Sequence, residues 1–172
     1  AGLPMAVDVC TGSGCIACAV ARRIPHARIW ATDTSPGALE LARSNALALG
    51  VAVDFLQSDL LDGVSAASMD LVVSNPPYVA TAECGRLPRT VRDFEPRLAL
   101  DGGPDGLGII SRLVSESARV LKSDGWLMME IGDDQAAAVA ELMCQTSHFH
   151  FKTLISDCAG KARVAIAERN RC

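Results

Sequence analysis

The chain has 172 residues, of which 49% are hydrophobic and 21% are charged, and its formal net charge is −4. This length and balance fit one globular domain with a sizeable core and exclude a disordered chain. The acidic charge gives no electrostatic footprint for nucleic acid, and no apolar run approaches the roughly 20 residues that a membrane-spanning helix needs. We therefore expect neither direct nucleic-acid binding nor membrane insertion.

The seven cysteines are scattered along the chain. An odd number of cysteines without a secretion signal is typical of reduced thiols in a cytoplasmic protein. Cys15 and Cys18 form a C-x-x-C pair with Cys10 nearby, but the three histidines lie far from them in sequence. We expect no metal site and interpret the cysteines as small hydrophobic residues.

Alternating apolar runs and helical patterns predict the order of elements in the first half of the chain. The helix expected over 36–49 has the clearest ends, with Ser35 as N-cap, Pro36 at the first helical position and Gly50 at the C-cap. Its expected apolar face is Leu39, Ala42, Ala46 and Leu49. The remaining elements expected here are strands over 6–10, 27–33, 51–58 and 70–75 and a helix over 15–24.

The second half begins with a segment, 76–104, that has no clear period, and such long loops tend to carry function. The expected elements after it are helices over 107–121 and 133–146 and strands over 125–131, 149–157 and 163–168, the last two joined by a turn around Gly160. Repeated strand–helix alternation predicts a mostly parallel sheet with helices on both faces. The final strand pair has no helix between its members and predicts an antiparallel hairpin at one edge.

A glycine-rich turn follows the first expected strand. Gly12-x-Gly14-x-x-Ala17, with Asp33 at the end of the second strand, matches a nucleoside-binding fingerprint. The glycines let a ligand approach the backbone, and the carboxylate can accept hydrogen bonds from ribose hydroxyls. S-adenosylmethionine (SAM) and NAD share the adenosine half, so this region leaves a methyltransferase and a dehydrogenase open.

Asp59 and Leu60 follow the third expected strand. The carboxyl ends of neighbouring strands in a doubly wound sheet line one crevice. We therefore expect Asp59 and the backbone of Leu60 to lie near the adenine.

Asn75-Pro76-Pro77-Tyr78 follows the fourth expected strand. Two consecutive prolines fix two φ angles and remove two N–H donors. What remains is a rigid pair of acceptors, the Asn75 side-chain oxygen and the Pro76 carbonyl, followed by the ring of Tyr78, the only tyrosine. Two acceptors can hold both hydrogens of an –NH2 group while the ring stacks on the planar system that carries it.

This motif fits the chemistry of a poorly nucleophilic amide or exocyclic amine. Accepting its hydrogens raises electron density on nitrogen as positive charge develops in the transition state. Holding the nitrogen in line with a sulfonium methyl group supplies the orientation. No general base is required before transfer, because the nitrogen becomes acidic only once it is methylated. A nicotinamide dehydrogenase leaves this motif unexplained.

Four parts of the chain together resemble the HemK/PrmC-type protein-(glutamine) methyltransferases: residues 10–14, Asp33, residues 74–78 and residues 94–107. The resemblance runs over nearly the whole chain. Asn-Pro-Pro-Tyr alone is shared with amino-methylating DNA and RNA enzymes, whereas the run Phe-Glu-Pro-Arg-Leu-Ala-Leu followed by Asp-Gly-Leu is far more specific to the glutamine branch.

The resemblance implies an α/β, Rossmann-like class I SAM-dependent methyltransferase fold with a seven-stranded, mostly parallel sheet and an antiparallel C-terminal hairpin. It also implies a site. Asp33 would hold the ribose of SAM, Leu60 would lie by the adenine, and Asn75 would bridge SAM and substrate. The residues implied to wrap the amino-acid moiety of SAM are Cys10, Thr11, Gly12, Ser13 and Gly14.

The implied substrate is a glutamine in a protein, most directly that of the Gly-Gly-Gln motif of peptide chain release factors. The glutamine amide would be gripped by Asn75, Pro76, Pro77 and Tyr78, of which Asn75, Pro76 and Tyr78 are the expected catalytic residues. Glu95 and Arg97 would shape the substrate pocket.

Two departures from the family pattern bear on the substrate and on the domain organisation. The family usually has glycine where Cys10 stands, and a sister branch that methylates a ribosomal protein often has Cys-Thr-Gly-Ser-Gly-Cys here. The release-factor enzymes also carry an N-terminal helical domain, so we expect residues 1–172 to be a catalytic domain that needs a further domain or a partner subunit. A nucleic-acid amino-methyltransferase and a non-catalytic SAM-binding subunit stay open as competing functions.

Overall fold

Seven strands form one mixed sheet in the order β3-β2-β1-β4-β5-β7-β6. The first five strands are parallel to one another, and β7 pairs antiparallel with both β5 and β6. The computed structural model describes residues 2–171. The strands are β1 (Met5–Val9), β2 (Arg28–Asp33), β3 (Asp54–Gln57), β4 (Met69–Ser74), β5 (Leu121–Glu130), β6 (Phe149–Ser156) and β7 (Ala162–Arg169). The expected doubly wound sheet with an antiparallel hairpin at one edge is confirmed.

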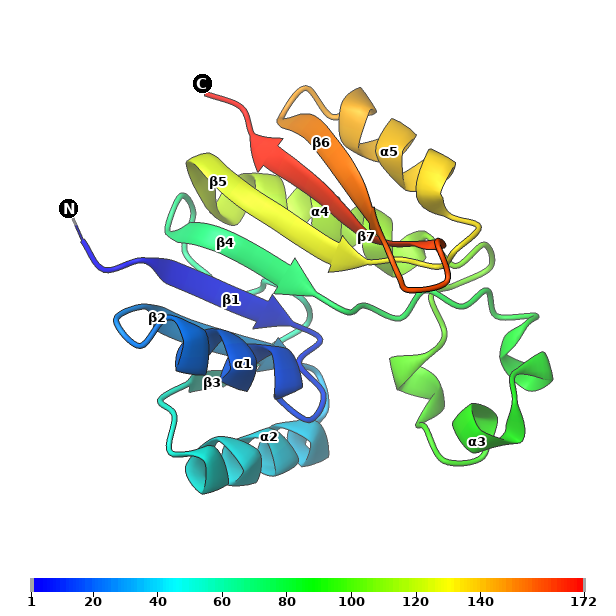
Figure 1. The fold of residues 1–172 in the computed structure, drawn as a ribbon, viewed down its shortest axis with the longest axis horizontal. Coiled ribbons are helices and arrows are strands. Elements are labelled where there is room, and N and C mark those ends of the chain that lie inside the picture. The colour runs from blue at the N-terminus through cyan, green and yellow to red at the C-terminus, as the bar shows by residue number, and fades with distance from the viewer. Residues whose placement is uncertain (1, 172) are drawn as a thin grey trace.

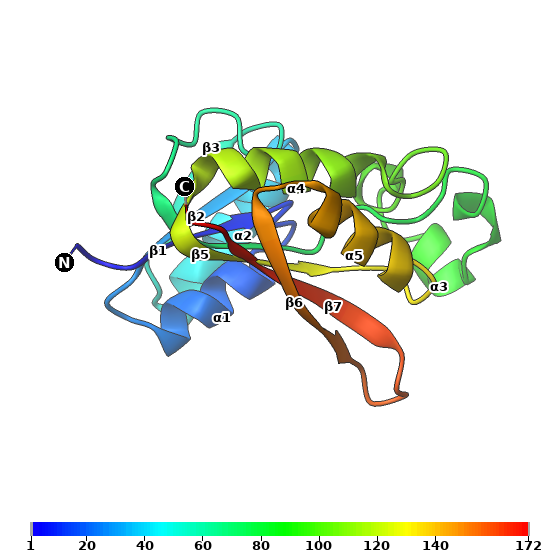
Figure 2. The same ribbon diagram turned by 90° about the horizontal axis from the view of Figure 1, so that it is seen from above.

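Helices cover both faces of this sheet (Figures 1 and 2). Helices α1 (Cys15–Arg23) and α2 (Pro36–Leu49) lie on one face, and α4 (Gly108–Val120) and α5 (Ala136–Gln145) lie on the other. The larger core lies under α4 and α5, where Val7 and Leu127 from the sheet meet Leu113. The smaller core under α1 is rich in alanine, as at Ala17 and Ala31, which lets the helix pack closely on the strands.

Part of the α1-side surface of the sheet carries no helix among residues 2–171. In Figure 1, α1 lies in front of β2 and α2 lies below it, whereas no helix lies in front of β4, β5 or β7. Leu71, Trp126 and Met128 lie on this surface, which we call the open face, and all three are partly exposed. Contiguous apolar surface of this kind usually marks an interaction site.

Capping contacts explain where α2 ends and why β3 is short. Ser35 Oγ accepts a hydrogen bond from Ala38 N at 3.2 Å, which confirms the predicted N-cap. At the other end, Gly50 has φ 65°, and the N–H groups of Gly50 and Val51 both bond back to α2. Val51 therefore cannot join the sheet, and β3 begins at Asp54, three residues later than predicted.

Three further sequence predictions need correction. Leu49 is 50% exposed rather than buried, because it is the last residue of α2, where the chain turns at Gly50. Strand β5 begins at Leu121, directly after α4, rather than at Gly125. The segment predicted to be irregular contains three short helical turns, which are η1 (Cys84–Arg86), α3 (Arg89–Arg92) and η2 (Arg97–Ala99). None of the helices within residues 2–171 is long and apolar enough to cross a membrane.

Candidate functional site

The parallel strands bring five loops to one edge of the sheet. The chain proceeds from β1 outward to β3 and then returns to build β4 and β5 on the other side of β1. The crevice between the carboxyl ends of β1 and β4 is therefore a topological switch point, where open α/β sheets bind their ligands. The glycine-rich loop follows β1 and the Asn-Pro-Pro-Tyr motif follows β4, so the fold places them side by side.

The glycine-rich loop is shaped by three residues in the left-handed region: Cys10 (φ 56°), Gly12 (φ 55°) and Gly14 (φ 78°). A Cβ on Gly14 would lie 2.9 Å from Cβ of Ala42, so α2 packs directly against this turn. A Cβ on Gly12 would meet nothing within 4 Å, so the backbone there is open to a ligand. Cys10 adopts a left-handed conformation that favours glycine, and glycine is the usual residue at this place in the family that the chain resembles.

Asp8 supports the loop from below and was not singled out by the sequence. It lies inside β1 with 1% of its surface exposed, and its Oδ2 accepts hydrogen bonds from Thr11 Oγ1 at 2.6 Å and Ala17 N at 3.0 Å. No donor within residues 2–171 reaches its Oδ1. Burial raises the pKa of the Asp8 carboxyl to about 6, partly opposed by these two hydrogen bonds, and Asp33 raises it further.

Three carboxylates surround the start of the glycine-rich loop. Burial raises the pKa of the Cys10 thiol to about 12, and the negative charges of Asp33, Asp8 and Asp59 also favour its neutral form, against a hydrogen bond with Ser74. The negative charge of Asp33, and that of Asp8 when it is ionised, disfavours an anionic group such as a pyrophosphate here and favours a cation, whereas the charge of Asp59 is paired with that of Arg112.

Asp33 joins the glycine-rich loop to the start of α2. Its Oδ2 accepts from Gly12 N and its Oδ1 from Ser35 N, both at 2.9 Å. Each carboxylate oxygen has a second lone pair. Asp33 is thus held in a fixed orientation and retains acceptor capacity for hydroxyl groups.

Asp59 and Leu60 lie in the loop after β3. Asp59 forms an ion pair with Arg112 of α4 at 2.9 Å and is about half exposed. Leu60 is buried with φ 49°, and its carbonyl accepts a hydrogen bond from Thr32 Oγ1 at 2.9 Å. The position of this loop beside Asp33 is compatible with contact to an adenine, which stays a prediction.

The Asn-Pro-Pro-Tyr motif combines a rigid backbone with free acceptors. Asn75 is exposed, and Pro76 and Pro77 are buried. Within residues 2–171, no hydrogen bond engages the Asn75 side chain or the Pro76 carbonyl. Tyr78 is half-buried and donates its hydroxyl to Glu130 Oε1 at 3.1 Å. The two predicted acceptors are therefore available to an incoming –NH2 group.

The loop over 101–107 packs directly against this motif and supports its backbone. Gly102 N donates to Val79 O at 2.8 Å, and Val79 N donates to Leu100 O at 2.9 Å. A Cβ on Gly102 would lie 2.7 Å from Pro77 O, and one on Gly106 would overlap Tyr78 O. The sequence identified this run as specific to a family, and the structure gives its physical reason: only glycine permits so close an approach.

Glu95 and Arg97 are both exposed and line a small hollow of about 200 Å³ with Cys84 and Leu100. Arg97 pairs with Asp101 at 3.1 Å, and Asp101 accepts a hydrogen bond from Thr81 Oγ1 at 2.6 Å. Arg97 is thereby linked to the motif loop indirectly, whereas no side-chain hydrogen bond of Glu95 to it is found within residues 2–171. Their contact with a substrate stays a prediction.

The cysteines within residues 2–171 are all free thiols, and Cys172 lies outside the described residues. No group of three or more His, Cys, Asp or Glu side chains in the same range is arranged to hold a metal ion. The prediction of reduced, metal-free cysteines stays open to elemental analysis.

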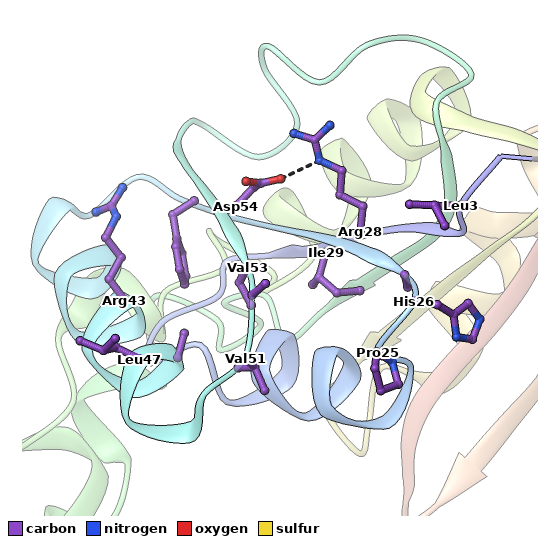
Figure 3. A pocket seen from close by; sticks show the side chains of 14 residues that line it. Leu3, Pro25, His26, Arg28, Ile29, Arg43, Leu47, Val51, Val53 and Asp54 are labelled. Carbon is purple, nitrogen blue, oxygen red and sulfur yellow. Dashed lines mark hydrogen bonds and ion pairs between the residues drawn. The ribbon is translucent and has the colours of Figure 1, made fainter.

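A separate groove of about 770 Å³ lies far from these loops (Figure 3). It is bordered by Arg28 and Asp54, which begin β2 and β3 and therefore lie at the amino ends of the strands. Asp54 is the sole carboxylate among its lining residues and is paired with Arg28 at 2.7 Å. The groove has no unpaired carboxylate among its lining residues, although the His26 imidazole lies there, and it is separate from the site at the carboxyl ends of the strands.

We expect Asp8→Asn to change the pH dependence of stability. The folded protein keeps the Asp8 proton up to about pH 6, whereas the unfolded chain releases it near 3.8. Ionisation of Asp8 therefore lowers the unfolding free energy as pH rises through this window, by about 3 kcal/mol in full. Asparagine keeps the acceptor for Thr11 and Ala17 and cannot ionise. The free energy of unfolding of the variant should therefore rise relative to that of the wild type between pH 4 and pH 8.

Denaturant unfolding at several pH values measures this difference. Carboxylates whose pKa is lowered by ion pairs, such as Asp70 and Asp133, affect both proteins equally and cancel. A stability gap that is the same at pH 4 and pH 8 would contradict the prediction.

The sheet order, the switch-point crevice and the loops around it define a class I SAM-dependent methyltransferase fold. A solved methyltransferase from Pyrococcus furiosus superimposes with a TM-score of 0.73 at 17% identity, covering 99% of this chain and 77% of that one. The family model "Methyltransferase small domain" matches residues 4–91. The chain belongs to the methyltransferase small domain family.

Curated relatives narrow the likeness further. Proteins named "Release factor glutamine methyltransferase" from Moorella thermoacetica and Koribacter versatilis are 44% and 41% identical over 164 residues, or 94% and 95% of this chain. The chain spans 58% of the length of each. These relatives confirm the resemblance to the HemK/PrmC type.

Proposed function

We propose that this domain transfers a methyl group from SAM to the side-chain amide nitrogen of a glutamine in a protein. The observation that carries the proposal is the pair of free acceptors, on Asn75 and Pro76, across the switch-point crevice from the glycine-rich loop. An amide –NH2 is the group whose two hydrogens such a pair can accept. If the substrate protein is a release factor, this domain acts in translation termination in the cytoplasm.

The residues around the glycine-rich loop fit SAM as the cofactor. SAM carries a cationic sulfonium and an ammonium group, which the negative charge of Asp33 attracts, as does that of Asp8 once it is ionised above about pH 6. The open backbone at Gly12 leaves room for its amino-acid moiety, and Asp33 retains lone pairs for the ribose hydroxyls. When bound, SAM supplies the methyl group. The residues that would hold it are Cys10, Thr11, Gly12, Ser13, Gly14, Asp33, Asp59, Leu60 and Asn75.

The motif residues would orient and activate the amide. Asn75 and the Pro76 carbonyl each accept one amide hydrogen, which directs the nitrogen lone pair toward the crevice and stabilises positive charge on nitrogen during transfer. Transfer forms an N–CH3 bond as the S–CH3 bond breaks, and the nitrogen then loses one proton to water. Tyr78 stacks on the amide plane while its hydroxyl stays bonded to Glu130.

The names of the relatives support a release factor as the substrate. The segment between the motif and α4 supports a protein substrate in general, because Phe94 and Leu98 are 83% and 65% exposed there. They flank Glu95 and Arg97, the residues predicted to shape the substrate pocket. Large exposed apolar side chains beside a site are typical of a surface that binds another protein.

Incubation with isotopically labelled SAM followed by mass spectrometry tests the function. We expect one labelled methyl group on the glutamine of the Gly-Gly-Gln motif of a release factor and none on a Gly-Gly-Asn variant of it. Label on a ribosomal protein alone would move the proposal to the sister branch. Label on nucleic acid, or on no substrate, would reject glutamine methylation.

We further propose that an additional N-terminal helical region or a partner subunit binds the substrate protein at a distance from the reacting amide. The open face around Trp126 supports this proposal, as do the greater lengths of the relatives. Remote contacts of this kind raise affinity and help to orient the reacting group.

A chimera of this chain with the N-terminal region of the Moorella thermoacetica relative is expected to have at least tenfold higher kcat/KM toward a whole release factor, roughly 1.4 kcal/mol of transition-state stabilisation. A short Gly-Gly-Gln peptide, which cannot reach remote contacts, should show no such gain. Equal kcat/KM for both proteins on the release factor would argue against the additional region.

A further inference from the structure

The only tyrosine of the chain is held at both ends by residues from one neighbouring strand and the turn after it. Its hydroxyl donates to Glu130 Oε1 at 3.1 Å, and its main-chain carbonyl accepts from Gln135 Nε2 at 2.9 Å. Glu130 is the last residue of β5, and Gln135 is the N-cap residue of α5. Residues at the end of β5 therefore fix the position of Tyr78, which follows β4.

The Gln135 side chain has no freedom to turn. It is 8% exposed, and besides Tyr78 O it donates to Gly106 O at 3.2 Å and accepts from Gly132 N at 2.9 Å. Both amide hydrogens and the amide oxygen are thus used. One buried amide ties together the Asn-Pro-Pro-Tyr motif, the 101–107 loop and the turn that follows β5.

We propose that Glu130 and Gln135 are positioning residues for methyl transfer, with Glu130 setting the Tyr78 ring and Gln135 setting the main chain that follows Asn75 and Pro76. The inference rests on the proposed function for its consequence, since it is the reacting amide that the ring and the acceptors must meet. Neither residue needs to touch the substrate. Both act through Tyr78.

The ionisation of Tyr78 reports on this arrangement. Burial raises the pKa of Tyr78, and the negative charge of Glu130 together with its hydrogen bond raises it further. The other charged groups that act on the phenol are Arg163, which lowers its pKa, and Asp133, which raises it. Because the chain has a single tyrosine, phenolate absorbance measures this one group.

Spectrophotometric titration of Glu130→Gln tests the contact without relying on activity. We expect the pKa of Tyr78 to fall toward its ordinary value near 10, because the charge is removed while the size is kept. Tyr78→Phe gives the blank. Glu168→Gln on β7, which removes a carboxylate paired with Lys152, is the matched control and should leave the titration unchanged. An unchanged titration in Glu130→Gln overturns the assignment of Glu130.

Kinetics test the consequence for transfer. Gln135→Met keeps the volume and removes all three hydrogen bonds, and we expect kcat on a release factor to fall about tenfold or more while calorimetric SAM affinity is unchanged. Gln145→Met, on the exposed end of the same helix, is the control and should keep full activity. Normal kcat in both Glu130→Gln and Gln135→Met overturns the positioning role. If Gln135→Met proves unstable, normal kcat in Glu130→Gln alone overturns it. A wild-type protein that shows the Tyr78 shift but methylates no glutamine rejects the proposed function and leaves the contact standing.

Discussion

Asn75→Ala is expected to abolish measurable methyl transfer, a loss of at least about 100- to 1000-fold in kcat, which is typical when a preorganised group that stabilises transition-state charge is removed. The Asn75 side chain is exposed and makes no hydrogen bond with residues 2–171, so its removal should not disturb the fold. SAM affinity, measured by calorimetry, should stay within about tenfold, or roughly 1.4 kcal/mol.

The control for this variant is Asn170→Ala. Asn170 donates its side-chain amide to Ser147 O at 2.9 Å on an exposed surface near the end of β7, so this change removes an asparagine away from the crevice. It should keep full activity. Near-normal turnover of Asn75→Ala would show that acceptance of the amide hydrogens does not drive the reaction.

Gly106→Ala is expected to reduce transfer by about 100-fold or more, because displacement of reacting groups by about 1 Å has that effect. The new Cβ would overlap Tyr78 O and lie 2.7 Å from Gln135 Nε2, so the motif backbone or the Gln135 side chain has to move. Its φ of 75° adds strain for any residue with a Cβ. Melting temperature, SAM affinity and kcat should be measured together.

The variant Gly103→Ala is a control that separates displacement of the motif from backbone strain in the loop. Gly103 lies in the same loop with φ 98°, but a Cβ there would find its nearest neighbour, Gly108 Cα, at 3.9 Å. This variant should lose some stability, on the order of 1 kcal/mol, and keep most of its activity. Equal losses of kcat in the two variants would mean that loop strain, and not contact with Tyr78, limits transfer.

Local signals in the sequence predicted the order of strands and helices because most of them act within a few residues. The cap at Ser35 and the turn at Gly50 are contacts of this kind, and both lie where predicted. The start of β3 could not be read in the same way, since Val51 is apolar and β-branched, and only its hydrogen bond to Ala46 shows that it still belongs to the helix cap.

The candidate site was predictable where a motif is contiguous and hidden where partners come from distant parts of the chain. The glycine-rich loop and Asn75 through Tyr78 are visible as short runs. Glu130 and Gln135 meet Tyr78 across 52 and 57 residues, and no local pattern marks them. Asp8 looks like one polar residue in an apolar strand, and its role depends on a backbone N–H of α1.

The position of Trp126 makes the open face visible in solution. This residue is 36% exposed, with the ammonium of Lys152 at 6.0 Å from the ring centre. Indole fluorescence moves to shorter wavelength when water is excluded, so a polypeptide that covers β4, β5 and β7 will shift the emission of this residue. The second tryptophan, Trp30, lies on β2 with its indole nitrogen already buried and contributes a steady background. Any partner of this surface can therefore be titrated optically, without a label and without turnover.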